Sequence, residues 1–255
     1  MEVELLKSKD KTKFNFILKK SSAAFANAVR RIMINEVPAL AIESVEFSKN
    51  SGIQYNEMVA HRLGLLSLKT DLKSYNLPDK CTCKDEGCAQ CQLKLVLKAK
   101  GPGYVYASDL KSDDPKCSPV FEKTIITKLL KNQELELVAT ATLGRGKQHV
   151  KWSSCLTFYK HPAIIDIKDK GKDVDKTVKS CPANVFENKG GKLSIKDQAA
   201  CHLCLACEDG NVKISAEENS FIFTVEPWGQ LEPKVIAKKS AEIINEKCED
   251  FLSKL

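Results

Sequence analysis

The opening positions alternate between hydrophobic and polar side chains and predict a β-hairpin. Val3 and Leu5 alternate with acidic residues, and the apolar positions of segment 14–18 alternate again. A period of two is the pattern of a strand that buries one face. The polar residues 8–11 between the two runs predict the turn.

A helical period follows from residue 21. Ser21 or Ser22 can accept hydrogen bonds from the free N–H groups of the first turn. We expect the helix to end before Pro38, because the residue preceding a proline is driven out of helical geometry. The apolar positions that form one stripe along this helix are Phe25, Ala28, Val29 and Ile32.

Strand patterns dominate the middle of the chain, at 41–47 and from about 52 to 162. Glycines at 101–103 and 144–146 predict turns between strands, and the Lys- and Asp-rich segment 166–175 predicts an exposed loop. The leucines that alternate with polar neighbours are Leu93, Leu95, Leu97, Leu135 and Leu137.

The last predicted elements are a strand at 221–225 and a long helix. Pro227 breaks the strand, and Pro233 lies in the first helical turn, where a proline loses no useful hydrogen bond. Because neither this helix nor the one at 21–37 is stable alone, each must bury its stripe against another element. The stripe of the last helix consists of Ile236, Ser240, Ile243, Ile244, Cys248 and Phe251.

These elements predict an α+β protein. The two chain ends, 1–48 plus 216–255, would form one discontinuous domain. A strand-rich domain at 49–163 and a small cysteine-rich domain at 164–215 would be inserted between them. The sequence contains no tandem repeat.

The composition is that of a globular protein. Of the 255 residues 43% are hydrophobic and 29% are charged, which excludes the disordered and fibrous classes. No run of about 18 apolar residues is present, and the acidic residues in 1–4 do not fit a secretory signal. We therefore expect a cytoplasmic protein. The formal net charge of +7 is scattered, so it fits either a nucleic-acid-containing assembly or an ordinary solvated surface.

Eleven cysteines in an intracellular chain indicate metal ligands rather than disulfides. Cys201, Cys204 and Cys207 have the spacing that wraps one corner of an iron–sulfur cubane in ferredoxins. Ferredoxin runs end in Cys-Pro, and the Cys-Pro pair here is Cys181 with Pro182. One 4Fe–4S cluster on Cys181, Cys201, Cys204 and Cys207 is therefore predicted.

The second cluster of a two-cluster ferredoxin is missing from this sequence. Its ligand positions hold Gly171, Val174, Thr177 and Asn211. All four ligands of one cluster are kept and all four of the other are lost, which supports a single cluster. Zinc on the same thiolates and unliganded thiols are the alternatives, and the loss of one corner would give 3Fe–4S.

Another cysteine group occupies the loop 81–91. Cys81, Cys83, Cys88 and Cys91 lie among charged neighbours, so no hydrophobic contact would order this loop. Four thiolates around a tetrahedral zinc ion would order it. Zinc is predicted here, with a second iron–sulfur cluster or a metal-free loop as the alternatives.

The sequence shows no group of residues with catalytic chemistry. The four histidines are spread out. Segment 144–147 is only superficially similar to a phosphate-binding loop, because Gln148 stands where Ser or Thr should bind magnesium. Without a general acid, base or nucleophile, the chain is not expected to be an enzyme on its own.

Several motifs resemble one known family. Residues 21–31, followed by Glu36-Val37-Pro38, resemble the dimerisation helix of the alpha-like subunits of multi-subunit DNA-directed RNA polymerases, most closely the archaeal branch of that family. The resemblance covers nearly the whole chain. Its further matches lie at 61–65, 101–103, 108–110, 143–147, 223–226 and 228–229.

The resemblance implies a discontinuous dimerisation domain, an inserted domain and, in some archaeal members, a ferredoxin-like domain. It also implies a heterodimer with the small alpha-like subunit, subunit L, on which the large catalytic subunits assemble, with DNA reached only through the complex. The middle cysteines resemble a zinc loop of the eukaryotic counterpart. Arg30 and Arg31 would point to partner subunits. The residues in or beneath the dimer interface would be Phe25, Val29, Ile32, Ile236, Ile243, Ile244 and Phe251.

We therefore predict a non-catalytic assembly subunit of DNA-dependent RNA polymerase. The alternative is a ferredoxin-like electron-transfer or redox-sensing protein, which would need a second, relaying cluster whose ligands are missing. A direct nucleic-acid-binding module would need a dense basic patch with interleaved aromatic residues, and the sequence shows none.

Overall fold

The computed structural model describes residues 1–6, 12–83, 86–168, 173–208 and 212–255. The predicted turn at 8–11 lies outside these residues, as do Gly171 and Asn211. The chain is mixed α+β, as predicted. It divides into two compact units, residues 1–30 with 157–225 and residues 31–156 with 226–255. These two units are groups of residues that contact one another in the folded chain. The three predicted domains and their boundaries stay a prediction.

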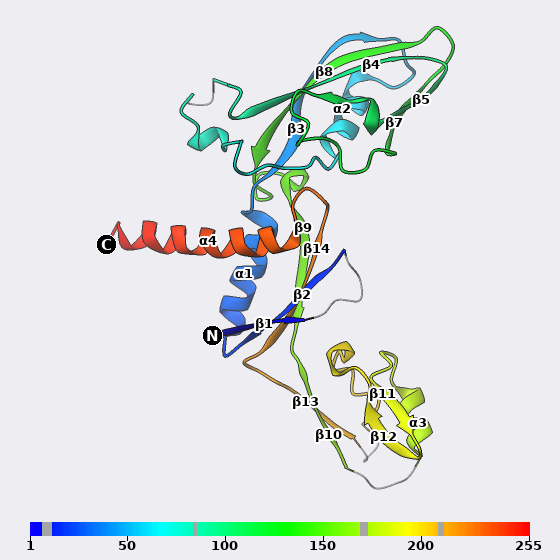
Figure 1. Cartoon of the computed structure of the whole chain (residues 1–255), viewed down its shortest axis with the longest axis vertical. Coiled ribbons are helices and arrows are strands. Elements are labelled where there is room, and N and C mark those ends of the chain that lie inside the picture. Colours follow the sequence, from blue (N-terminus) through cyan, green and yellow to red (C-terminus); the bar gives the residue numbers. More distant parts are fainter. Residues whose placement is uncertain (7–11, 84–85, 169–172, 209–211) are drawn as a thin grey trace. The chain divides into compact units, whose positions relative to one another are not determined.

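The first unit is built on an antiparallel sheet in the order β1-β2-β14-β9 (Figure 1). In the core, Phe16 lies opposite Phe223 with stacked rings 4.8 Å apart, and Tyr159 packs against Phe221 at 5.4 Å. The alternating positions of β2 and β14 therefore bury one common face, whereas Val3 and Leu5 of the predicted hairpin are 60% and 63% exposed. The strands are β1 (Glu2–Leu6), β2 (Phe14–Lys19), β9 (Cys155–Lys160) and β14 (Phe221–Pro227).

The cysteine-rich part of the first unit is reached through a two-stranded ribbon of β10 (Ala163–Ile167) and β13 (Val212–Ala216). The helix α3 (Val174–Ser180) follows, and then the hairpin of β11 (Phe186–Lys189) and β12 (Lys192–Ile195). The prediction of a loop over 166–175 is wrong at both ends, because β10 runs to Ile167 and α3 begins at Val174.

The helix α1 (Ala23–Asn35) joins the two units along the chain. It begins as predicted, because the Phe25 N–H donates to Ser22 Oγ at 3.3 Å. It ends before Val37 and Pro38, as the proline requires.

The second unit contains the sheet β3-β8-β4-β6, of which Figure 1 labels β3, β8 and β4. Its core holds all five alternating leucines. The prediction that strands dominate 52–162 missed the helix α2 (Asn56–Gly64), which buries Val59 and Leu63. The sheet strands are β3 (Ala39–Asn50), β4 (Gln92–Lys100), β6 (Lys111–Ser112) and β8 (Glu134–Gly144). Beside them, β5 (Gly103–Tyr106) pairs with β7 (Ile125–Leu129). Short 3-10 turns lie at Pro78–Lys80, Ala107–Asp109, Val150–Trp152 and, in the first unit, Gln198–Ala200.

The helix α4 (Pro233–Leu252) completes the second unit. Its first three turns bury Ile236, Ser240 and Ile243, whereas its last six residues, from Lys247 on, are exposed. Lys247 pairs with Glu36 at 2.9 Å, which ties the middle of the helix to its unit. Within the described residues, no helix combines the length and apolar character needed to cross a membrane.

Candidate metal centres

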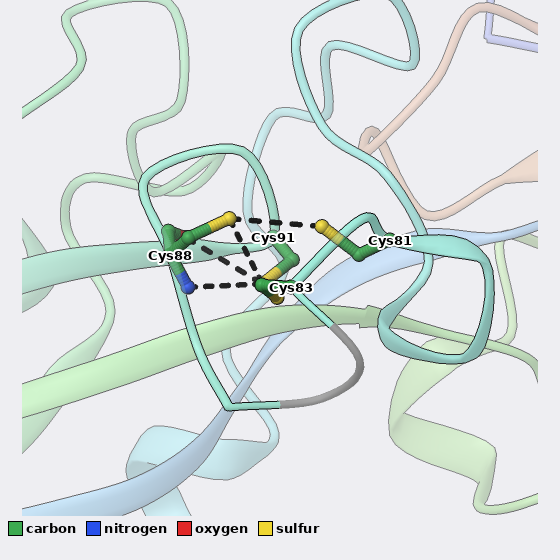
Figure 2. A group of neighbouring side chains, drawn as sticks. All are labelled: Cys81, Cys83, Cys88 and Cys91. Atoms are coloured by element: carbon green, nitrogen blue, oxygen red, sulfur yellow. Dashed lines mark hydrogen bonds between the residues drawn. The ribbon is translucent and has the colours of Figure 1, made fainter.

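The loop between the turn Pro78–Lys80 and β4 gathers four cysteine sulfurs. The Sγ atoms of Cys81, Cys83, Cys88 and Cys91 all lie within 4.8 Å of one another (Figure 2). All four thiols are free, so no disulfide closes the loop. The structure therefore brings together the whole set that the sequence predicts for this loop.

The sulfur positions fit one tetrahedral ion. The sulfur–sulfur separations are 3.6 Å between Cys81 and Cys88, 3.5 Å between Cys83 and Cys91, and 3.7 Å between Cys88 and Cys91. Zinc–sulfur bonds of about 2.3 Å make a tetrahedron with edges of about 3.8 Å. A single ion would thus fit with little movement of the thiolates.

Backbone hydrogen bonds fix the loop around these sulfurs. The Cys88 N–H donates to Cys91 Sγ at 3.2 Å, and the N–H groups of Cys91 and Gln92 donate to the Cys88 carbonyl at 3.0 and 2.9 Å. Gly87 has a φ of 89°, a left-handed conformation that glycine adopts without steric cost. The chain can therefore turn sharply just before Cys88.

The thiols of this loop differ in acidity. The hydrogen bond with the Cys81 side chain lowers the pKa of Cys83 to about 7, and burial raises the pKa of Cys91 to about 12. Four thiolates this close repel one another, so they cannot all ionise unless a cation replaces their protons. The loop can hold a metal, and its thiolate donors suit zinc or iron.

The second cysteine group lies in the first unit. Cys181 follows α3, and the other three follow the turn Gln198–Ala200. Cys181, Cys201 and Cys207 are buried with Val185 and Phe186, whereas Cys204 is exposed. Among the described residues, only the 81–91 loop gathers three or more ligand atoms within 4.8 Å of one another, so this second set is more open.

The four thiols nevertheless share one environment. Burial raises the pKa of Cys207 to about 11, and the charges of Cys181, Cys201 and Cys204 act in the same direction. The corners of a multi-iron cluster hold their thiolates farther apart than a single ion does. The second set is wider than the first.

The backbone around Cys204 has a conformation that the sequence does not predict. Leu203 and Leu205 have φ values of 59° and 60°, the left-handed region that costs a non-glycine residue about 1–3 kcal/mol. Alternation of right- and left-handed residues turns backbone N–H groups toward one point and makes an anion-binding nest, a feature of many iron–sulfur sites. Leu203 and Leu205 therefore flank Cys204 with two left-handed residues.

The predicted interface residues occupy three different environments. Phe25, Val29 and Ile32 of α1 and Ile244 of α4 are half-buried, while Ile236 and Ile243 are buried within their own unit. Arg30 donates to Asn27 Oδ1 at 2.9 Å and Arg31 is exposed. Phe251 is 64% exposed.

Comparisons with known proteins identify one family of relatives. Residues 42–156 match the family model "RNA polymerase Rpb3/RpoA insert domain". The chain is 38% identical to the DNA-directed RNA polymerase subunit Rpo3 of Archaeoglobus fulgidus, over 98% of this chain and 96% of that protein. It is 35% identical to the Rpo3 of Methanosphaera stadtmanae, over 99% and 98%. The Rpo3 of Pyrococcus furiosus is also 35% identical, over 100% of this chain and 97% of that protein.

Proposed function

The chain belongs to the Rpo3 family of archaeal RNA polymerase subunits, and from this membership we propose how it serves the polymerase. It is a non-catalytic assembly subunit of DNA-directed RNA polymerase. It pairs with the small alpha-like subunit, subunit L, and the heterodimer is the platform on which the large catalytic subunits assemble.

The exposed C-terminal end of α4 carries the pairing proposal. Phe251 and Leu252, its last two residues, are 64% and 67% exposed, and Leu255 just beyond the helix is 88% exposed. Apolar side chains grouped at one helix end mark a surface that another protein covers. Burial of this tip against the small subunit would remove it from water and stabilise the complex.

A charge at the helix tip tests this surface. We expect Phe251→Asp to abolish co-purification with co-expressed small subunit. Phe121→Asp is the matched control, because Phe121 is 60% exposed and belongs to the insert domain rather than to α4. Equal retention of the small subunit by both variants would refute the assignment of the interface.

We assign the two cysteine groups to two metal centres. The tetrahedral sulfur spacing supports zinc at Cys81, Cys83, Cys88 and Cys91. The wider set, with its strained loop, supports a 4Fe–4S cluster in a ferredoxin-like fold on Cys181, Cys201, Cys204 and Cys207. Zinc supplies a redox-inert staple for its loop, and the iron–sulfur cluster orders the small fold and is able to accept an electron.

Metal analysis under nitrogen tests both assignments. The co-expressed heterodimer should contain iron and sulfide together with one zinc per chain. Cys204→Ser should lower the iron content and leave the zinc content and the pairing unchanged. Cys88→Ser should lower the zinc content and leave the iron content unchanged. Iron-free protein with two zincs per chain would refute the cluster.

Redox sensing is a second candidate role of the same centre, and the exposure of Cys204 favours it. Of the four ligands, this corner is the one that an oxidant in solvent reaches first. Air should convert the loaded protein to a three-iron form detectable by electron paramagnetic resonance. A cluster that stays intact in air would argue for a purely structural role.

A further inference from the structure

A lysine from the sheet of the first unit reaches the cysteine-bearing loop. Lys160 is the last residue of β9, and its Nζ donates a hydrogen bond of 2.9 Å to the backbone carbonyl of Cys201. The Lys160 side chain is half-buried, so the ammonium is held against the loop rather than in bulk water. Sequence reasoning missed this contact, because it joins residues 41 positions apart.

The positive charge of Lys160 is not cancelled by an ion pair. In the described part of the chain, no carboxylate forms a salt bridge with Lys160, and the Cys201 carbonyl is its hydrogen-bond acceptor. Asp197, near the start of the same loop, caps the turn before Cys201 by accepting from the Ala200 N–H at 3.3 Å. Burial lowers the pKa of Lys160, and the charges of Cys201 and Asp197 act in the opposite direction. The hydrogen bond to the Cys201 carbonyl places this ammonium group directly beside the loop.

We propose that Lys160 is a positioning residue that orients the Cys201 ligand and raises the reduction potential of the cluster. This inference rests on the proposed iron–sulfur centre. An iron–sulfur cluster with four thiolate ligands is anionic and becomes more so when it accepts an electron. A nearby positive charge in a half-buried site stabilises the reduced form more than the oxidised form. The hydrogen bond to the Cys201 carbonyl holds the first ligand of the run in place, as outer contacts of metal ligands do.

A redox titration of three variants tests the proposal. The full chain, co-expressed with the small subunit and purified under nitrogen, is titrated with dithionite and mediators while electron paramagnetic resonance follows the reduced cluster. Lys160→Met should lower the ratio of reduced to oxidised cluster at a fixed potential by about tenfold, which equals about 59 mV for one electron. Lys160→Arg, which keeps the charge and the donor, should stay near wild type. Lys192→Met removes an equal charge from the exposed strand β12 and should also stay near wild type.

The outcomes separate this inference from the proposed function. Iron-free wild-type protein would overturn the cluster assignment, and this inference with it. Loaded Lys160→Met protein with the wild-type potential would overturn the inference alone. If Lys160→Met loses iron on purification, the reduction potential is measured on Lys160→Gln instead, because the glutamine amide keeps a hydrogen-bond donor but carries no charge. A wild-type potential in that variant would also overturn the proposal.

Discussion

The 81–91 loop should lose its metal steeply as the pH falls. A metal ion must displace the protons of its thiol ligands, so its apparent affinity falls tenfold per pH unit for each ligand that stays protonated without metal. Burial raises the pKa of Cys91 to about 12, so this thiol is protonated throughout the range from pH 8 to pH 6. Cys91 alone should thus lower the affinity about 100-fold between these values.

Cys83 adds a second contribution to the pH dependence of the affinity, and the slope of this contribution changes near pH 7. The hydrogen bond with Cys81 lowers the pKa of Cys83 to about 7, so this group changes from mostly thiolate at pH 8 to mostly thiol at pH 6. Its protonation lowers the affinity by about a further tenfold, and the two groups together by about 1000-fold.

Competition with a chromophoric zinc chelator, repeated from pH 8 to pH 6, measures this dependence. Cys83→Ser is the informative variant, because it should bind more weakly, lose the bend near pH 7 and keep the steep dependence that Cys91 causes. A wild-type affinity that falls less than tenfold over the two units would refute a site in which buried thiols must lose protons.

Three further substitutions test the packing of the chain. Phe223→Ala empties a fully buried position stacked on Phe16 and should lower the unfolding free energy by about 3–5 kcal/mol in urea titrations; a loss below about 1 kcal/mol would show that this ring is not core. Ser22→Ala removes the acceptor for the Phe25 N–H and should cost about 1 kcal/mol by the same measurement, whereas Ser48→Ala on the exposed face of β3 should be neutral. Ile243→Asp places a carboxylate at a buried position and should destabilise the isolated chain by more than about 3 kcal/mol, whereas Phe251→Asp should change it by less than about 0.5 kcal/mol. Equal losses of unfolding free energy in this last pair would contradict the different burial of these two positions of α4.

Periodicity was enough for the elements with strong patterns. The alternation in β2 and β14 identifies strands whose inner face the structure buries, and the stripe of α4 identifies a helix that buries Ile236, Ser240 and Ile243 but leaves Phe251 exposed. The helix α2 could not be found in this way. It buries only Val59 and Leu63, and its N-cap residue Tyr55 makes no side-chain capping bond. A short helix between strands, with one buried pair and no capping signal, is indistinguishable from a loop in the sequence.

The sulfurs of the 81–91 loop were predictable as a group, whereas the surroundings of the cysteines were not. Cysteine spacing identified this group, because ligand spacing along the chain is a local property, and the ligand role of the second group stays a prediction. The left-handed backbone of Leu203 and Leu205 has no sequence signal, since leucine seldom adopts it. Lys160 is contributed by a strand distant in sequence, so only the folded chain reveals its contact with Cys201.

The pairing of β2 with β14 also constrains how the protein is made. Phe16 and Phe223 face each other although they are about two hundred positions apart in the chain. During synthesis on the ribosome, the β2 edge of the β1–β2 hairpin stays unpaired until β14 has emerged, near the end of the chain. The insert domain at 42–156 can fold during that interval, because the strands that its sheet pairs, β3, β4 and β8, are all synthesised before β14. Closure of the terminal sheet is then a late step of biosynthesis, and a truncated chain would expose an unpaired, aggregation-prone strand.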